Sequence, residues 1–320
     1  MKAFSISSLL LALATWAISA AVHADLEFSP CYLTGSGGDG NLQAQCTTWQ
    51  RPVNPDEPTG PQVELFVAKL PTTAIDPAKD ALTIINGGPG GSSIDMMVDF
   101  APILRTFTRE RDVVVLDQRG TGRSAALQCA SLTDAPEIFA AEHVVSTTRE
   151  CLNQLDYDPR YFTTSIAVQD LEALRRTLGY EQLSVYGVSY GTRVAMQFMR
   201  KYPESTRSAV IDGVVPPTIN LGADVAINSQ ITLDKVFARC AQEPSCVERF
   251  GGLSEDFQRL SNRLREQTIP MQLQHPVTGV LTDLELTYGH LTVWLRLALY
   301  APETTALIPL IIDQAANHAN

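Results

Sequence analysis

Charged residues are scarce in this chain, at 18% of 320 residues, and basic ones are the scarcer kind, with 24 Lys and Arg against 35 Asp and Glu. The formal net charge of -11 argues against a nucleic-acid partner and against binding to anionic membranes, because both are themselves negatively charged. The sequence also lacks a Cys-x-x-Cys pair, a cluster of His and Cys at metal-ligand spacing, and a glycine-rich loop ending in Gly-Lys-Ser/Thr. We therefore expect no metal and no cofactor.

Long apolar runs are confined to the N-terminus. Lys2 precedes an apolar run from Leu9 to Val22, and Val22-His23-Ala24 has the small-x-small pattern of a cleavage site. This pattern predicts that residues 1–24 are a secretory signal peptide, cleaved near Ala24. A signal-anchor helix is the alternative, but the run is short for a span of about 20 residues. Because no later segment is long and apolar enough to span a membrane, we expect a secreted or periplasmic mature chain.

The six cysteines all follow residue 24, and their number is even. In an oxidising compartment this favours disulfides over free thiols. Proximity in the sequence predicts three pairs, namely Cys31–Cys46, Cys129–Cys151 and Cys240–Cys246.

Short apolar runs of buried-strand length alternate with helical patterns in the first two thirds of the chain. Residues 165–179 and 192–202 have the apolar spacing of helices. Residues 25–50 show no such period and are expected to be irregular, and residues 51–61 to form a connection. The predicted strands are Val63–Ala68, Ala81–Ile85, Asp112–Leu116, Leu183–Tyr186 and Ser208–Ile211. Alternating strands and helices predict an α/β domain with a mostly parallel, doubly wound sheet.

This alternation stops at Pro216-Pro217. Beyond it the sequence is largely helical, with one hairpin expected at residues 271–284. We therefore expect two units after the signal peptide, residues 25–217 and residues 218–320.

The segment Gly187-Val188-Ser189-Tyr190-Gly191 joins a predicted strand to a predicted helix. Strand, G-x-S-x-G and helix in that order are typical of a nucleophile elbow, in which a serine is lifted above the edge of a sheet. Ser189 is therefore the candidate nucleophile. An ordinary glycine-flanked turn is the alternative interpretation.

A serine nucleophile needs donors for the oxyanion that forms when it attacks a carbonyl. One donor is expected to be the backbone N–H of Tyr190, which follows the serine. The glycine-rich loop at residues 86–90 follows an earlier strand, where the second donor lies in such sites, and the N–H of Gly88 is the candidate.

Three motifs together resemble the proline iminopeptidase and tripeptidyl aminopeptidase family of α/β-hydrolases. They are Gly87-Gly88-Pro89-Gly90, the segment Asp117-Gln118-Arg119-Gly120-x-Gly122-x-Ser124, and the Gly187-x-Ser189-Tyr190-Gly191 turn. The resemblance covers roughly Cys31 to the C-terminus, with Asn86 in the place where the family usually has histidine. It implies the α/β-hydrolase fold with a helical cap at residues 218–320.

The resemblance also implies an exopeptidase that acts on a peptide or small acyl substrate. Carboxylates of the cap are implied to bind the substrate amine. The sequence does not single out these carboxylates. Five acidic residues are candidates, each with the alternative of a solvated surface charge: Glu255, Asp256, Asp283, Glu285 and Glu303.

The acid and histidine of the triad follow the last strands in that fold, and no such strand pattern follows Ala316. We therefore expect the C-terminal strands to be absent and the cap incomplete, as in an N-terminal fragment of a longer hydrolase with its acid and base beyond residue 320. Asp212, at the end of a predicted strand, is a weaker candidate for the acid. The histidines are poor candidates for the base: His143 is placed in a connector, His275 in a hairpin, His290 in a helix, His318 at the terminus, and His23 in the signal peptide.

The sequence thus predicts a serine aminopeptidase that releases N-terminal residues or short peptides through an acyl-enzyme at Ser189. Two alternatives stay open. One is a carboxylic-ester hydrolase of the same fold, and the other is a non-catalytic binding protein on a hydrolase scaffold.

Overall fold

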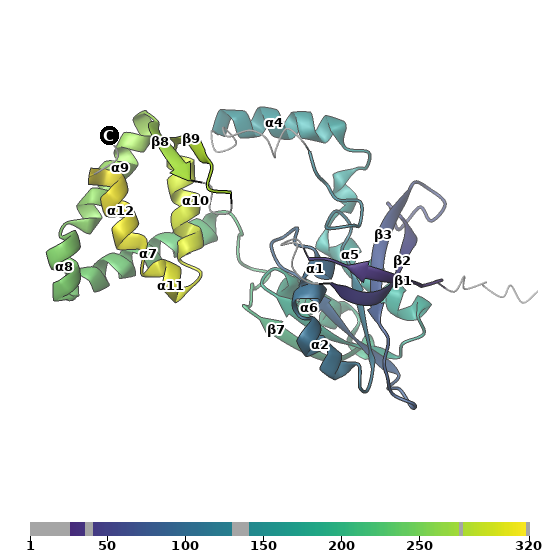
Figure 1. Ribbon diagram of the computed structural model, residues 1–320. Helices are drawn as coiled ribbons and strands as arrows, with labels where there is room; N and C mark the ends of the chain where they lie inside the picture. Colours follow the sequence, from purple (N-terminus) through teal and green to yellow (C-terminus); the bar gives the residue numbers. More distant parts are fainter. Residues whose placement is uncertain (1–25, 36–40, 130–140, 275–277, 318–320) are drawn as a thin grey trace, which may run out of the picture.

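The computed structural model describes residues 26–35, 41–129, 141–274 and 278–317, arranged as Figure 1 shows. Seven of the described strands form one sheet, in the order β1-β2-β3-β5-β4-β6-β7. Their bounds are Ser29–Leu33 for β1, Leu42–Pro52 for β2, Gln62–Leu70 for β3, Asp80–Ile85 for β4, Asp112–Leu116 for β5, Gln182–Val188 for β6 and Thr206–Asp212 for β7.

The sheet combines an antiparallel part with a parallel part. Strands β1, β2, β3 and β5 are joined by antiparallel pairing, whereas β5, β4, β6 and β7 are joined by parallel pairing. The carboxyl ends of the four parallel strands therefore meet at one edge of the sheet, where ligands bind in folds of this kind.

Helices cover both faces of this sheet. Helices α1 (Ser93–Asp99) and α2 (Ala101–Phe107) pack on one face, and α5 (Thr164–Thr177) and α6 (Gly191–Lys201) on the other. Two separate apolar clusters result, because successive side chains of a strand point to opposite faces. Of the parallel strands, β4 is buried along its whole length and β5 and β6 along most of theirs, whereas β7, at the edge of the described sheet, is largely exposed.

The chain after Pro217 has a different architecture and its own apolar core. Figure 1 draws it as a group of helices with one hairpin, apart from the sheet. The elements are α7 (Ala223–Gln242), α8 (Pro244–Phe250), α9 (Leu253–Glu266), β8 (Ile269–Gln274), β9 (Leu281–Leu286), α10 (Tyr288–Ala298), α11 (Pro302–Thr305) and α12 (Ile308–Asn317). Their buried side chains include Phe237, Leu260 and Leu291.

The three predicted disulfides are all formed: Cys31–Cys46, Cys129–Cys151 and Cys240–Cys246. The first joins β1 to β2. The third joins the end of α7 to α8.

Two predictions were wrong. The described parts of residues 25–50, which are residues 26–35 and 41–50, are not irregular, because β1 and most of β2 lie there. Strand β2 is stabilised by pairing with β3 on one side and β1 on the other. Its side chains are mixed in polarity, so pairing rather than an apolar run decides its structure. His143 was also misplaced, since it lies within helix α4 (Ala141–Gln154) and not in a connector.

In the part of the chain that is described, no helix is both long and apolar enough to cross a bilayer. The predicted signal peptide lies outside the described residues. So do the loop at residues 36–40 and the residues His275 and His318.

Candidate functional site

Ser189 occupies a sharp turn between β6 and α6. Its φ is 53°, in the left-handed region that residues other than glycine seldom adopt. Such a backbone conformation costs about 1–3 kcal/mol and persists only where the surrounding contacts hold it. Part of what holds it is a hydrogen bond of 2.8 Å from the Ser189 N–H to the carbonyl oxygen of Asp212, at the end of β7. This is the geometry that the G-x-S-x-G motif predicts.

The two glycines of the motif are required by close packing around this turn. A Cβ on Gly187 would lie 2.5 Å from the carbonyl oxygen of Gly191, and a Cβ on Gly191 would overlap the carbonyl oxygen of Ile85 in β4. Any side chain at these positions would therefore push α6 away from the strands β4 and β6.

Thr192 braces the turn from within the first turn of α6. Its fully buried hydroxyl donates to the Ser189 carbonyl oxygen at 2.6 Å and accepts the N–H of Val215 at 2.9 Å. The sequence analysis missed this residue. Its signal would have been a hydroxyl side chain one residue after the motif, where it can return a bond to the carbonyl three residues earlier.

The glycine-rich loop after β4 lies directly against Ser189. A Cβ on Gly87 would come within 2.8 Å of the Ser189 Cβ and 3.2 Å of its Oγ, so only glycine allows this approach. Gly88 and Gly90 have φ values of 114° and 108°, which L side chains seldom adopt.

The N–H groups in this region differ in whether they already have an acceptor. The Gly87 N–H donates to Asn86 Oδ1 at 2.7 Å, and the Gly91 N–H donates to the Gly87 carbonyl oxygen at 3.0 Å. Across the described ranges, no protein acceptor is hydrogen-bonded to the N–H of Gly88 or of Tyr190. These are the two groups that the sequence predicts as oxyanion donors.

Asp117 follows β5 and holds the far end of the same loop. Its carboxylate is fully buried and accepts hydrogen bonds from Ser92 Oγ at 3.0 Å, the Ile94 N–H at 3.0 Å and the Arg123 N–H at 2.9 Å. Burial raises the pKa of this carboxyl above its ordinary value, while these hydrogen bonds act in the opposite direction. In the sequence, Asp117 is recognisable only as the first residue of the Asp-Gln-Arg-Gly motif, and that motif alone indicates no role for it.

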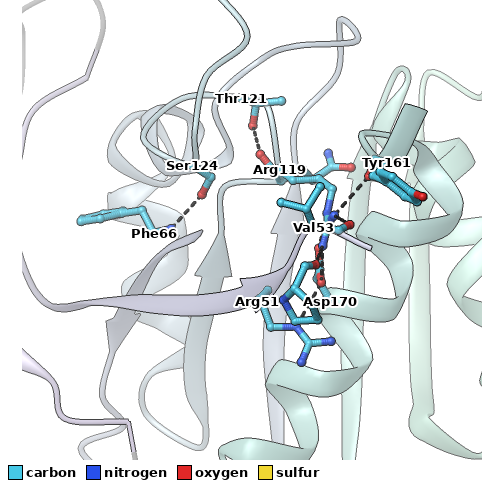
Figure 2. Close-up of polar contacts among 10 residues, drawn as sticks. Arg51, Val53, Phe66, Arg119, Thr121, Ser124, Tyr161 and Asp170 are labelled. Atoms are coloured by element: carbon cyan, nitrogen blue, oxygen red, sulfur yellow. Dashed lines mark hydrogen bonds and ion pairs between the residues drawn. The ribbon is translucent and has the colours of Figure 1, made fainter. Parts of the chain in front are cut away.

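Arg119, from the same motif, is buried in a network that joins three elements (Figure 2). Its guanidinium donates two hydrogen bonds to Asp170 in α5, at 2.7 and 2.9 Å, and Arg51 adds a further one to that carboxylate at 3.2 Å. The remaining donors reach main-chain carbonyls of Val53 at 2.9 Å, Tyr161 at 3.1 Å and Pro52 at 3.3 Å. These hydrogen bonds tie the end of β2 and the residues around Tyr161 to α5.

Asp212 lies beside the turn, but its side chain bonds elsewhere. The carboxylate accepts a hydrogen bond from the Tyr186 hydroxyl at 2.7 Å, and this bond raises the pKa of Tyr186. The ring of His290 is hydrogen-bonded to Thr287 and not to Asp212 or Ser189. The assignment of Asp212 as the triad acid stays a prediction.

The remaining candidates lie in the helical unit after Pro217. His290 closes a capping box with Thr287 at the start of α10. Asp256 in α9 is bonded to Arg259 and Asn317, whereas Glu285 in β9 accepts a hydrogen bond from Thr268 at 2.6 Å. Asp283 accepts one from Gln272 in the same hairpin; Glu255 lies in the first turn of α9 and Glu303 in that of α11. None of these contacts brings a carboxylate to Ser189.

The chain belongs to the alpha/beta hydrolase fold family, whose sequence model matches residues 80–288. This range includes the loop after β4, the Asp117 motif and the Ser189 turn, and it extends to the first residue of α10. It is more than half of the chain.

Curated relatives of the chain include peptidases. It is 28% identical to the serine protease Hip1 of Mycobacterium tuberculosis over 244 residues, which are 69% of this chain and 46% of the relative. It is 26% identical to the tripeptidyl aminopeptidase of Streptomyces lividans over 241 residues, which are 67% of this chain and 44% of the relative. The chain thus spans about half the length of the curated relatives it matches.

Among solved structures, a proline iminopeptidase-related protein from Thermus thermophilus is 25% identical, with a TM-score of 0.34. The match covers 52% of this chain and 44% of that structure.

Proposed function

We propose that Ser189 is the nucleophile of a serine hydrolase whose reaction passes through an acyl-enzyme. In this mechanism Ser189 Oγ attacks the substrate carbonyl carbon, and the N–H groups of Tyr190 and Gly88 bind the oxyanion that forms. The observation that carries the proposal is the strained backbone of Ser189 between β6 and α6, beside two N–H groups that no described acceptor occupies.

The substrate is proposed to be the N-terminal end of a peptide, so that the products are single residues or short peptides. Support comes from the names of two relatives, a serine protease and a tripeptidyl aminopeptidase. Residues 218–320 are proposed to form a cap over the active site, and a carboxylate of this cap would bind the substrate amine. Glu255, Asp283 and Glu303 suit this role better than Asp256, which is 7% exposed and bonded to its own helix.

Ser189 needs a general base to become a strong nucleophile. Since the ring of His290 is hydrogen-bonded to Thr287 in the cap of its own helix, we propose that the base and its acid are held outside the described residues. Loss of a triad member lowers the rate by about 10⁴-fold or more, and it slows covalent labelling as well as turnover, because both begin with attack by Ser189 Oγ. Labelling is still the better first test, since it needs only one reaction per molecule and can be followed over long incubation.

Export from the cytoplasm is part of the same proposal. The three disulfides support it, because such bonds persist in oxidising compartments. The mature chain would begin after Ala24.

The test is reaction of the chain with an alkyl fluorophosphonate, followed by peptide mass spectrometry. We expect one modified residue, Ser189, which is labelled slowly while its base is missing, and complete loss of labelling in Ser189→Ala. Ser165 provides a matched control, because it lies in the first turn of α5 and shares the electrostatics of a helix N-terminus without a strained turn. Ser165→Ala should label like the parent, whereas scattered labelling of several serines would contradict the proposal.

The substrate class is tested separately with aminoacyl arylamides and short acyl esters. Cleavage of the arylamides supports an aminopeptidase. Hydrolysis of esters alone would favour a carboxylic-ester hydrolase. A binding protein on this scaffold would show neither activity and no modification of Ser189.

A further inference from the structure

Asp117 is a fully buried carboxylate that none of the described basic side chains neutralises through an ion pair. The buried acids Asp80 and Asp170, by contrast, are each paired with an arginine. Burying an unpaired charge is costly, so the structure keeps Asp117 only because its hydrogen bonds compensate. The donors of these hydrogen bonds therefore indicate which part of the structure the Asp117 carboxylate holds in place.

Two of the donors flank the start of α1, directly after the glycine-rich loop. Ser92 is the N-cap of α1, where its Oγ accepts the Asp95 N–H at 3.0 Å while donating to Asp117. The Ile94 N–H donates to the same carboxylate oxygen at 3.0 Å. The carboxylate thus fixes the end of the loop to the end of β5, the neighbouring strand.

From Ser92 the bonds continue through Asn86 to the loop itself. Asn86 Nδ2 donates to the Ser92 carbonyl oxygen at 2.8 Å, and its Oδ1 accepts the Gly87 N–H at 2.7 Å. The Asn86 N–H also donates to Ser93 Oγ at 3.1 Å. Asn86 therefore occupies the N–H of Gly87, whereas the N–H of Gly88, the next residue, has no acceptor among the described residues.

The other side of Asp117 is closed by a loop that packs against it. Gly122 has a φ of 49°, and a Cβ there would overlap Asp117 Oδ2 and come within 2.9 Å of the Ser92 Cβ. The Arg123 N–H donates to that same Oδ2 at 2.9 Å. A longer or differently shaped side chain at position 117 would not fit this space.

We propose that Asp117 is a positioning residue for the oxyanion hole, which through Ser92 and Asn86 holds the Gly88 N–H in place beside Ser189. The inference rests on the proposed function of Ser189. Asp117 is the first residue of the Asp-Gln-Arg-Gly motif, and its hydrogen bonds go to Ser92, Ile94 and Arg123 and not to Ser189. The inference gives this residue a role in the site without direct contact to the nucleophile.

The test compares Asp117→Asn with Asp80→Asn in the full 320-residue chain. Asparagine has the shape of aspartate but turns an NH₂ toward at least one of the three donors, so the loop loses an anchor. Asp80 is the matched control: it is buried, starts β4 at the end opposite to the loop, and is paired with Arg111. Both variants should lower the urea midpoint of unfolding, since each disturbs a buried carboxylate.

Two further measurements separate positioning from stability. The first is the second-order rate of Ser189 labelling by the fluorophosphonate, whose phosphoryl oxygen takes the oxyanion position. We expect a loss of roughly tenfold to a hundredfold in Asp117→Asn, because small displacements of a catalytic donor have effects of this size. We expect labelling at the parental rate in Asp80→Asn.

The second measurement is amide hydrogen exchange, which does not depend on activity. Exchange over residues 86–94 should be faster in Asp117→Asn, and exchange over β6 should not change. If Asp117→Asn does not fold, Ser92→Ala removes one link of the same chain of bonds and should give the same two changes at smaller size.

Parental labelling together with unchanged exchange over residues 86–94 would overturn the inference. If the parent chain itself is not labelled at Ser189, the proposed function fails instead, and the exchange measurement still decides whether Asp117 holds the loop.

Discussion

Removal of the Arg119 guanidinium gives the sharpest prediction about stability. Arg119→Met keeps most of the aliphatic stem but deletes five donated hydrogen bonds, two of them to the carboxylate of Asp170. Asp170 is then left buried with one bond from Arg51. Breaking a buried ion pair from one side costs about 3–5 kcal/mol, and the bond from Arg51 places the expected loss near the lower end of that range.

Two further variants separate the contributions of charge and of hydrogen bonding to the free energy of unfolding that Arg119→Met loses. Arg119→Lys keeps the charge but not the planar fork, so it should lose an intermediate amount. The double variant Arg119→Met with Asp170→Leu removes both charges and should recover much of the loss. A deficit of about 1–3 kcal/mol should remain, because three main-chain carbonyls still lack their donor.

The assay is urea unfolding followed by circular dichroism, with hydrogen exchange over α5 to localise the effect. Arg160→Met is the control, since Arg160 is 84% exposed and bonded to Asp158 two residues away. It should unfold like the parent. A loss in Arg119→Met as small as in this control would refute the reasoning, and so would a double variant no more stable than the single one.

Two predictions concern packing and pH. Gly191→Ala should destabilise the chain by about 1–3 kcal/mol in urea unfolding, because the new Cβ overlaps the Ile85 carbonyl, whereas a Cβ on Gly222 makes only ordinary van der Waals contact and Gly222→Ala should not. Equal effects of the two would contradict the packing argument. Burial opposes the ionisation of Glu172, yet hydrogen bonds and charges from two neighbouring arginines outweigh burial and lower its pKa. The stability it contributes is therefore present above its unfolded pKa of about 4.3 and lost as the pH falls through the folded value. The difference in urea midpoint between the parent and Glu172→Gln should shrink between about pH 5 and pH 3; a constant difference would show that the carboxylate charge contributes nothing.

Features that depend on neighbours in the sequence were predicted well. The Ser189 turn was found because a buried strand, two glycines and a helix follow one another without a gap, and the structure has β6 and α6 on either side of it. The strands β3 to β7 were also found from local patterns. The apolar runs of β4, β5 and β6 correspond to burial on both faces, and the alternation in β3 corresponds to burial on one, whereas the apolar run of β7 lies at the edge of the described sheet and is largely exposed. The disulfides could be paired because each closes a short stretch of chain, of 15, 22 and 6 residues.

Features that depend on distant partners were missed. Strand β1 pairs with β2, and β2 pairs with β3, and no local period in the mixed side chains of β1 and β2 reveals this pairing. The sequence also contained no sign that Gly87 donates its N–H to Asn86 while Gly88 keeps its own.

By itself, then, the sequence determined the fold class, the position of the candidate nucleophile and the pairing of the cysteines, because periodicity and turn chemistry are local. Only the tertiary structure decided the roles of Asp117 and Arg119, which belong to one motif. Asp117 bonds to the first turn of α1, 23 residues earlier, and Arg119 bonds to a residue of α5, 51 positions further on. Hydrogen bonds over such separations depend on how the strands and helices pack, and residue order alone does not encode that geometry in any local pattern.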